Sequence, residues 1–152
     1  MTNKELKSIL QKECSRIVEE RHQRVKQSII GIEESLFEES KSSAGDKHET
    51  GRAMLQIERE NKGKQLQVVE KTLQALKRIA NHTTSDTAHL GSLVFTTIET
   101  YFISVSVGVI NVQSKNYIAV SPMSPIGMTL MGKKEGAGLS FNGNEFRIIK
   151  VV

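Results

Sequence analysis

Two carboxylates three residues apart, Asp46 and Glu49, are the side chains of this chain whose type and spacing best suit chemistry. They belong to the segment Gly45-Asp46-Lys47-His48-Glu49, which lies between two long segments of helical pattern. Mg²⁺ prefers oxygen ligands and often takes only one or two of them from a protein. A pair of carboxylates on a turn between two helices can therefore share the ion with another molecule. The alternative is structural: Asp46 caps the second helix and Glu49 completes a capping box.

Two long helices are expected to position this pair. Residues 4 to about 42 form the first, because apolar residues recur at alternating spacings of three and four, as in a coiled coil. This seam consists of Val18, Val25, Ile29, Ile32 and Leu36. A second helix, from about 50 to 81, repeats the spacing at Leu66, Val69, Leu73, Leu76 and Ala80. The short connection makes the helices antiparallel. We therefore predict a coiled-coil arm over residues 1–81, with its tip at about 43–51.

The composition limits the class of protein. The chain has 152 residues, 38% of them hydrophobic and 5% aromatic, which suits a helix pair with one small domain better than a single large globule. Its net charge of +4 permits contact with RNA or an acidic surface without requiring it. The single cysteine, Cys14, cannot form an internal disulfide, so a reducing cytoplasm is expected. No stretch approaches the roughly 20 apolar residues that cross a bilayer, so we expect no membrane contact.

The sequence pattern changes after residue 81. Residues 82–88 are polar and short-chained, as in a linker. A short helix is expected to begin at the cap Ser124 with Pro125 in its first position, and to stop at Gly132. Strands are expected where β-branched and aromatic residues dominate, at 93–97, 101–105, 107–112, 117–120 and 146–152. The predicted fold class is α+β, with a small antiparallel sheet domain over residues 89–152 that follows the helical hairpin.

Two separated motifs resemble the same protein family. The segment from Val120 to Lys134, VSPMSPIGMTLMGKK, closely resembles the signature S-x-x-SP-[IL]-G-x-x-L-[IL]-GK of the C-terminal domain of Gre transcript-cleavage factors, GreA and GreB. The segment from Gly45 to Glu49 is similar to the family's GD-x-x-E tip, which long helices also flank. Chain length, domain order and linker position agree as well. The resemblance therefore covers nearly the whole chain.

The resemblance implies a function in transcription. In the Gre family the FKBP-like C-terminal domain docks on RNA polymerase, and the coiled coil enters the secondary channel of a backtracked enzyme. By this likeness Asp46 and Glu49 are the catalytic pair, which shares the second catalytic Mg²⁺ of the polymerase while the nascent RNA 3′ end is cut. The chain would act as a monomer, have no cofactor of its own and not be an enzyme itself. The implied docking residues are Ser124, Pro125, Ile126, Gly127 and Met131.

The second helix also carries a series of cations. Backtracked RNA is a suitable partner for them, because its phosphates attract Lys and Arg. The alternative is a solvated helix face, on which some cations pair with glutamates of the first helix. The candidate RNA-binding residues are Arg52, Arg59, Lys62 and Lys64.

Other functions stay open beside a cleavage-stimulating factor. The tip continues as Thr50-Gly51-Arg52-Ala53, where the Gre family usually has E-N-A-E-Y. This difference allows a secondary-channel regulator that enters the polymerase without cleaving RNA. The FKBP-like domain also suggests a peptidyl-prolyl isomerase, although the chain offers few aromatic residues for a proline pocket. Cys14 has no evident His or Asp partner and is expected to be an ordinary thiol.

Overall fold

The computed structural model describes residues 1–41, 45–79 and 84–152, and the side chains of residues 45–48 are outside the description. The chain forms two compact units. One unit combines Met1–Ile17 with Gln74–Val152, and the other is Val18–Leu73. The first 17 residues, which the sequence assigns to the arm, therefore belong with the sheet domain. Among the described residues, no helix combines the length and apolarity that a membrane crossing requires.

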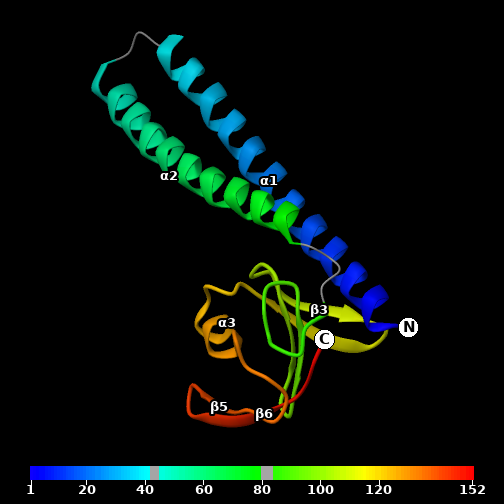
Figure 1. The fold of residues 1–152 in the computed structure, drawn as a ribbon. Coiled ribbons are helices and arrows are strands. Elements are labelled where there is room, and N and C mark those ends of the chain that lie inside the picture. Colours follow the sequence, from blue (N-terminus) through cyan, green and yellow to red (C-terminus); the bar gives the residue numbers. More distant parts are fainter. Residues whose placement is uncertain (42–44, 80–83) are drawn as a thin grey trace. The chain divides into compact units, whose positions relative to one another are not determined.

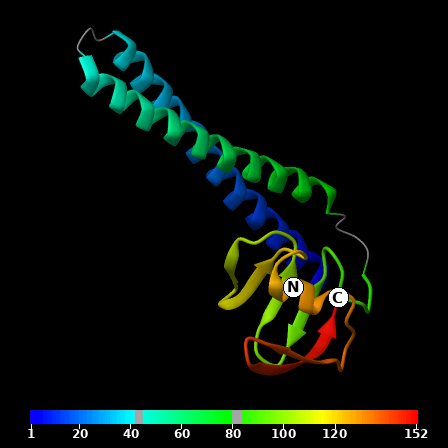
Figure 2. The ribbon, with the colours of Figure 1, turned by 90° about the vertical axis from the view of Figure 1, so that its left-hand side faces the viewer.

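Two antiparallel helices form the hairpin, as the sequence predicts. Helix α1 spans Asn3–Lys41 and α2 spans Gly45–Arg78 (Figures 1 and 2). The predicted seam is confirmed for α1, where Val18, Ile29 and Ile32 are buried. Helix α2 begins at Gly45, about five residues earlier than expected. The predicted tip is therefore mostly helical, since only residues 42–44 separate the two helices.

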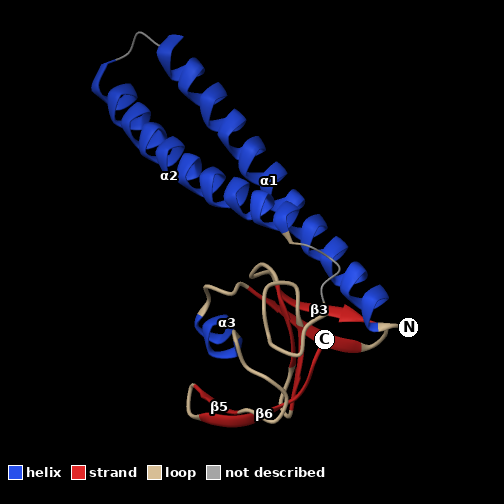
Figure 3. Ribbon diagram, viewed as in Figure 1, coloured by secondary structure: helices blue, strands red, loops and turns tan. Residues whose placement is uncertain are grey.

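A six-stranded sheet with one short helix, α3 (Pro125–Leu130), follows the hairpin in sequence (Figure 3). The strands lie in the order β3-β4-β2-β1-β6-β5. Their bounds are Leu93–Thr96 for β1, Thr100–Ile103 for β2, Gly108–Val112 for β3, Lys115–Val120 for β4, Gly138–Phe141 for β5 and Asn144–Val151 for β6. The α+β class, with a helical hairpin followed by a small sheet, is confirmed.

The sheet differs from the sequence prediction in two details. The pair β2–β4 is parallel, so the sheet is mixed rather than wholly antiparallel. Strand β5 was not predicted, although its turn is a strong local signal. Asn142 and Gly143 both have positive φ, 50° and 78°, and join β5 to β6 in the geometry that a two-residue Asn-Gly hairpin prefers. Short strands with alternating exposure are easily missed when only apolar runs are counted.

The sheet buries apolar residues on both faces. One face carries a core of Val94, Tyr101, Ile103 and other residues, with Leu130 of α3 packed into the same cluster. Neighbouring residues of a strand point to opposite faces, so Phe102, which is only 1% exposed, belongs to the other face.

The base of α1 contacts the second face of the sheet. The Ser104 Oγ donates a hydrogen bond to Gln11 Oε1 at 3.2 Å, and Gln11 Nε2 donates to the carbonyl oxygen of Leu76 on α2 at 3.1 Å. Leu10 and Cys14, on the same stretch of α1, are fully buried. These contacts explain why residues 1–17 form one unit with the sheet.

The predicted linker is partly structured. Residues 82 and 83 lie outside the described part of the chain, whereas Thr87 forms a β-bridge with Lys134. Ala88 is 1% exposed, and its N–H and carbonyl form hydrogen bonds with Lys133 and Gly132. The end of the expected linker is thus a component of the sheet domain's core.

Candidate functional site

The candidate catalytic positions lie in the first turns of α2. The backbone of residue 46 is in the helix that begins at Gly45, while the Asp46 side chain is outside the described part of the structure. Glu49 is exposed to solvent. Residues three apart in a helix lie on the same face, so positions 46 and 49 are neighbours there. The helix already includes Gly45, so the backbone of residue 46 is helical.

A glutamate of α1 lies beside the first turns of α2. A Cβ built at Gly51 would contact Glu39, with the Oε1 atom at 3.7 Å. The next residue, Arg52, donates from Nη1 to the carbonyl oxygen of Leu36 at 3.2 Å. The residues by which this chain departs from the Gre pattern therefore lie against the last turns of α1. Carboxylates at this end of the hairpin come from both helices.

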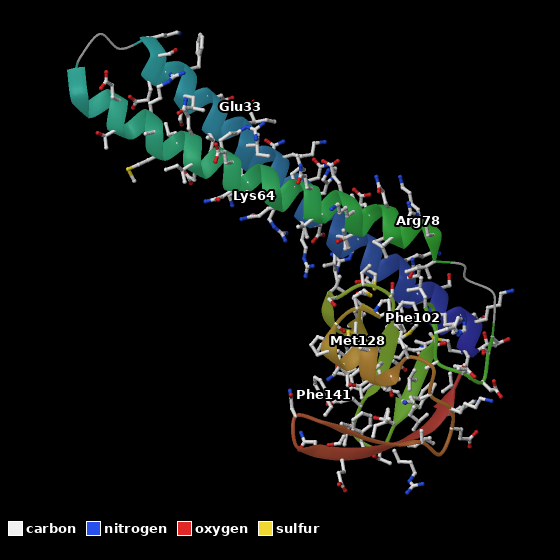
Figure 4. All side chains as sticks on the ribbon, turned by 60° about the vertical axis from the view of Figure 1, so that its left-hand side comes forward. Glu33, Lys64, Arg78, Phe102, Met128 and Phe141 are labelled. Carbon is white, nitrogen blue, oxygen red and sulfur yellow. The ribbon has the colours of Figure 1, made fainter. Side chains whose placement is uncertain are left out.

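The four candidate RNA-binding cations fall into two groups, according to whether they bond to α1. Arg59 forms an ion pair with Glu33 of α1, with 3.1 Å between Arg59 Nε and Glu33 Oε1. Arg52 is held on α1 by its bond to Leu36. For Arg59 the structure agrees with the alternative of pairing with a glutamate of the first helix, whereas the bond of Arg52 is to a backbone carbonyl. Neither contact involves Lys62 or Lys64. Figure 4 labels Lys64 on α2 and Glu33 on α1.

Lys62 and Lys64 line a groove of about 630 Å³ between the two helices of the hairpin. Arg21 and Arg24 of α1 line it too, and no acidic residue does. Its apolar surface comes from Val25, Val68 and Val69. The sequence prediction considered only the cations of the second helix and missed these two arginines. The antiparallel pairing of the helices would have identified them, because residues 21–28 lie opposite residues 62–69.

The segment that resembles the Gre signature forms a closely bonded turn before α3. Ser124 is the N-cap, since its Oγ accepts from the N–H of Gly127 at 3.1 Å and donates to the carbonyl oxygen of Ser121 at 2.6 Å. A Cβ at Gly127 would overlap that same carbonyl oxygen, so the position requires glycine. The predicted helix start, its first-turn proline and its stop near Gly132, which has φ of 79°, are confirmed.

The five candidate docking residues have different exposure. Ser124 and Gly127 have the local roles just described, and Ile126 and Met131 pack against the core cluster. Pro125 is exposed. The large apolar side chains that are most exposed nearby are Met123 at 79% and Met128 at 61%, which were not among the candidates. A role of this segment in docking stays a prediction, since its signature residues already have structural reasons for their identity.

The described residues also bear on two other kinds of chemistry, a cysteine nucleophile and a metal site. Burial raises the pKa of the Cys14 thiol to about 11, which disfavours the thiolate that a nucleophile needs. Among the described side chains, no three of His, Cys, Asp or Glu come together in a way that could hold a metal ion. A carboxylate pair at positions 46 and 49 would supply only part of a coordination sphere, so a second molecule would have to supply the remainder.

Comparisons with known proteins find similarity at the level of solved structures. No family model matches the sequence. No curated protein matches it either. Among solved structures, the chain is similar to the transcription factor Gfh1 at 19% sequence identity, over 86% of this chain and 92% of that one, with a TM-score of 0.34. At this TM-score the two backbones differ too much for the match to bear on function.

Proposed function

We propose that this chain is a cytoplasmic transcription elongation factor of the Gre type. Its docking domain would bind RNA polymerase, and its hairpin would enter the secondary channel and stimulate cleavage of backtracked RNA. The polymerase would be the enzyme, and this chain would complete its active site. The observation that carries the proposal is the position of residues 46 and 49 in the first turns of α2, with Glu49 exposed, at the end where the two helices meet.

The chemistry of this end of the hairpin fits a shared metal ion. Carboxylate oxygens are suitable ligands for Mg²⁺, which takes few of its ligands from any one protein. In a two-metal site, the ions would activate the attacking water and stabilise the leaving oxygen of the cleaved phosphodiester. Asp46 and Glu49 would hold one ion from one side and orient it toward the 3′ segment of the RNA. Helical backbone at both positions would fix their spacing.

The length of the hairpin also fits insertion into a channel. The part of α1 within the hairpin unit, Val18–Lys41, has 24 residues and is about 36 Å long at 1.5 Å per residue. Its seam is apolar, while most of its remaining surface is polar. A slender pair of helices has little room for a catalytic pocket of its own. It is better suited to present side chains to another molecule.

A cleavage assay tests the proposal. Purified protein is added to backtracked complexes of the cognate polymerase with Mg²⁺, and short 3′ RNA fragments are measured. Asp46→Ala and Glu49→Ala should each lower the cleavage rate by roughly a hundredfold or more, as when a group that stabilises the transition state is removed. Glu60→Ala is the matched control, because Glu60 is an exposed carboxylate elsewhere on α2.

The same assay separates the alternative function. Tight binding to the polymerase with no fragments from the unmodified protein would identify a secondary-channel regulator that does not cleave. The specific observation that favours this alternative is Arg52, a cation in the second turn of α2 that is anchored to Leu36. Fragments that are unaffected by both tip substitutions would contradict the role of the carboxylate pair.

A further inference from the structure

The groove that Lys62 and Lys64 line has an aliphatic floor. Val25 of α1 and Val69 of α2 are half-buried and belong to the seam between the two helices. Val68 lies beside them on α2 and is 63% exposed. The volume of the groove, about 630 Å³, is within the range of ligand-binding clefts. The described residues thus leave open a hollow that an apolar group can enter.

Cations lie on both sides of this floor. Two contacts across the hairpin fix which residues of its helices are level, namely Arg59–Glu33 and His22–Glu70. They place Arg24 of α1 level with Val68, and Ser28 level with Lys64 of α2. Arg24 and Lys64 are both exposed and line the groove from different helices. A ligand in the groove therefore meets a positive charge on either side.

These cations have no anionic partner within the hairpin. The side chains of Arg24, Lys62 and Lys64 form no ion pair or hydrogen bond with any described residue. None of the described residues that line the groove is acidic. A patch of one sign attracts partners of the other sign and repels those of its own. The groove is therefore complementary in charge to an acidic ligand.

The shape of the groove indicates which class of acidic ligand fits. Proteins that bind single-stranded nucleic acid usually stack its bases on aromatic side chains, whereas none of the described residues that line this groove is aromatic. A membrane surface is too flat to reach the floor of a hollow between two helices. An amphipathic helix is convex and can lay its apolar side into such a groove.

An exposed stripe on α2 continues the line of the groove. Met54, Asn61 and Val68 follow one another at intervals of seven, and all three are exposed. Residues at this interval line up where one helix packs along another, and a single polar residue among them can fix the register. The stripe is about 21 Å long at 1.5 Å per residue, or about four helical turns. Its length and spacing suit a helix as the ligand.

We propose that the groove binds an acidic amphipathic helix of a partner protein, which packs on the hairpin as a third helix. Apolar residues of this helix cover Val25, Val68 and Val69. Acidic residues on either side of them pair with Arg24 and Lys64. A second hollow of the hairpin is lined by acidic residues, which confines the acidic side chains of the partner to part of its length; these residues are Glu34, Glu38 and Glu39.

This binding goes beyond the proposed function and does not depend on it. The proposed cleavage involves positions 46 and 49, whereas the groove is lined by residues within 21–28 and 62–69. A third helix would add roughly 10 Å to the thickness of the hairpin. In a factor whose hairpin enters a channel, the partner helix would therefore compete with insertion.

Fluorescence anisotropy with two matched, labelled peptides tests the proposal. The acidic peptide has three heptads with Leu at the first and fourth positions. Its fifth and seventh positions are Glu in the first two heptads and Gln in the third, and the basic peptide has Lys in place of each Glu. The acidic peptide should bind the full chain saturably and at least tenfold more tightly than the basic one. Added salt should weaken this binding, because the cations are exposed.

Charge reversal in the groove tests the electrostatic part of the interaction. Arg24→Glu and Lys64→Glu should each raise the dissociation constant of the acidic peptide by roughly tenfold or more, because each sets a like charge against it. Lys26→Glu is the matched control, since it makes the same change of charge at an exposed position outside the groove. It should have little effect. Circular dichroism should show the same helix content for all three variants.

A neutral substitution separates a helix from RNA as the ligand. Val68→Ser should weaken the acidic peptide by about fivefold or more, because it removes apolar surface from the contact. It should leave the affinity for a single-stranded RNA oligonucleotide unchanged, since RNA phosphates pair with the cations alone. Gln67→Ser, at the neighbouring exposed position outside the groove, should affect neither ligand.

Several results would overturn the proposal. The first is an acidic peptide that shows no saturable binding at millimolar concentration, and the second is a basic peptide that binds equally well. Equal weakening by Arg24→Glu and Lys26→Glu would show that only net charge matters. RNA that binds where the acidic peptide does not, with Arg24→Glu sensitive and Val68→Ser silent, would assign the groove to nucleic acid instead.

Discussion

At the scale of single residues, two glycines in helices differ in whether their surroundings leave room for a Cβ atom. Gly127 is required by its own fold, because any Cβ there would overlap the carbonyl oxygen of Ser121. That oxygen cannot move easily, since it also accepts from Ser124 Oγ. Gly31 has open space around it and only weakens its helix. A glycine in a motif can thus reflect packing, whereas Gly31 has no packing reason among the described residues.

The stability of two variants should therefore change in opposite directions. Gly127→Ala should lose roughly 3 kcal/mol or more of unfolding free energy, because backbone atoms must shift to admit the methyl group. Gly31→Ala should gain about 0.5–1 kcal/mol from helix propensity. Urea unfolding measures both. An equal effect of the two substitutions would contradict the close approach at Gly127.

At the scale of elements, the cations of the hairpin differ in the side chains that lie beside them. Arg59 is paired with Glu33, and exposed ion pairs of this kind contribute about 0–1 kcal/mol. Lys64 lies on the groove, where no acidic residue is among the lining side chains. The spacing of these two cations along α2 gives no reason to distinguish them. The structure distinguishes them because α1 brings a carboxylate to one and further cations to the other.

If backtracked RNA follows the hairpin, the two cations should affect its binding differently. Lys64→Ala should weaken the affinity for a single-stranded RNA oligonucleotide and reduce the salt dependence by a slope of about 0.7, the value for one lost phosphate contact. Arg59→Ala should alter RNA affinity little and destabilise the hairpin slightly. Titration of both variants at several salt concentrations provides the measurement. If Lys64→Ala leaves the slope unchanged, the groove is not a site for RNA.

At the scale of the whole molecule, α1 contributes to both compact units. Its first 17 residues bury Leu10 and Cys14 within the unit that contains the sheet, and its remaining residues form the hairpin with α2. The Gln11 side chain bonds to Ser104 after β2 and to Leu76 of α2, so three distant segments of the chain meet there. The stability of the sheet should depend on a residue far from it in sequence.

Leu10→Ala tests this dependence. The substitution should cost about 2–5 kcal/mol, the usual range for a fully buried leucine. The sheet contains both tyrosines, Tyr101 and Tyr117, so tyrosine fluorescence during urea unfolding reports on it. Lys12→Ala, at an exposed position on the same helix, should shift the midpoint little. A Tyr-monitored midpoint that Leu10→Ala leaves in place would contradict the packing of α1 on the sheet.

The sequence by itself determined the elements whose signals are local. Seam residues such as Val18 and Ile32 predicted the helical hairpin, because a repeat of three and four residues suffices to define a helix face. Ser124, Pro125 and Gly132 predicted α3, because caps and stops act within one turn. The same local reading placed Asp46 and Glu49 where the two helices meet, and the structure has both residues in the first turns of α2. It missed β5 because a four-residue strand has little periodicity to detect.

Only the tertiary structure decided which residues meet across the chain. The parallel pairing of β2 with β4, the membership of residues 1–17 in the sheet unit and the grouping of Arg21 and Arg24 with Lys62 and Lys64 depend on contacts between distant segments. Such contacts are selected by burial and by charge in three dimensions, and residue spacing along one element does not encode them. The carboxylate pair could thus be found from sequence, whereas its surroundings on α1 could not.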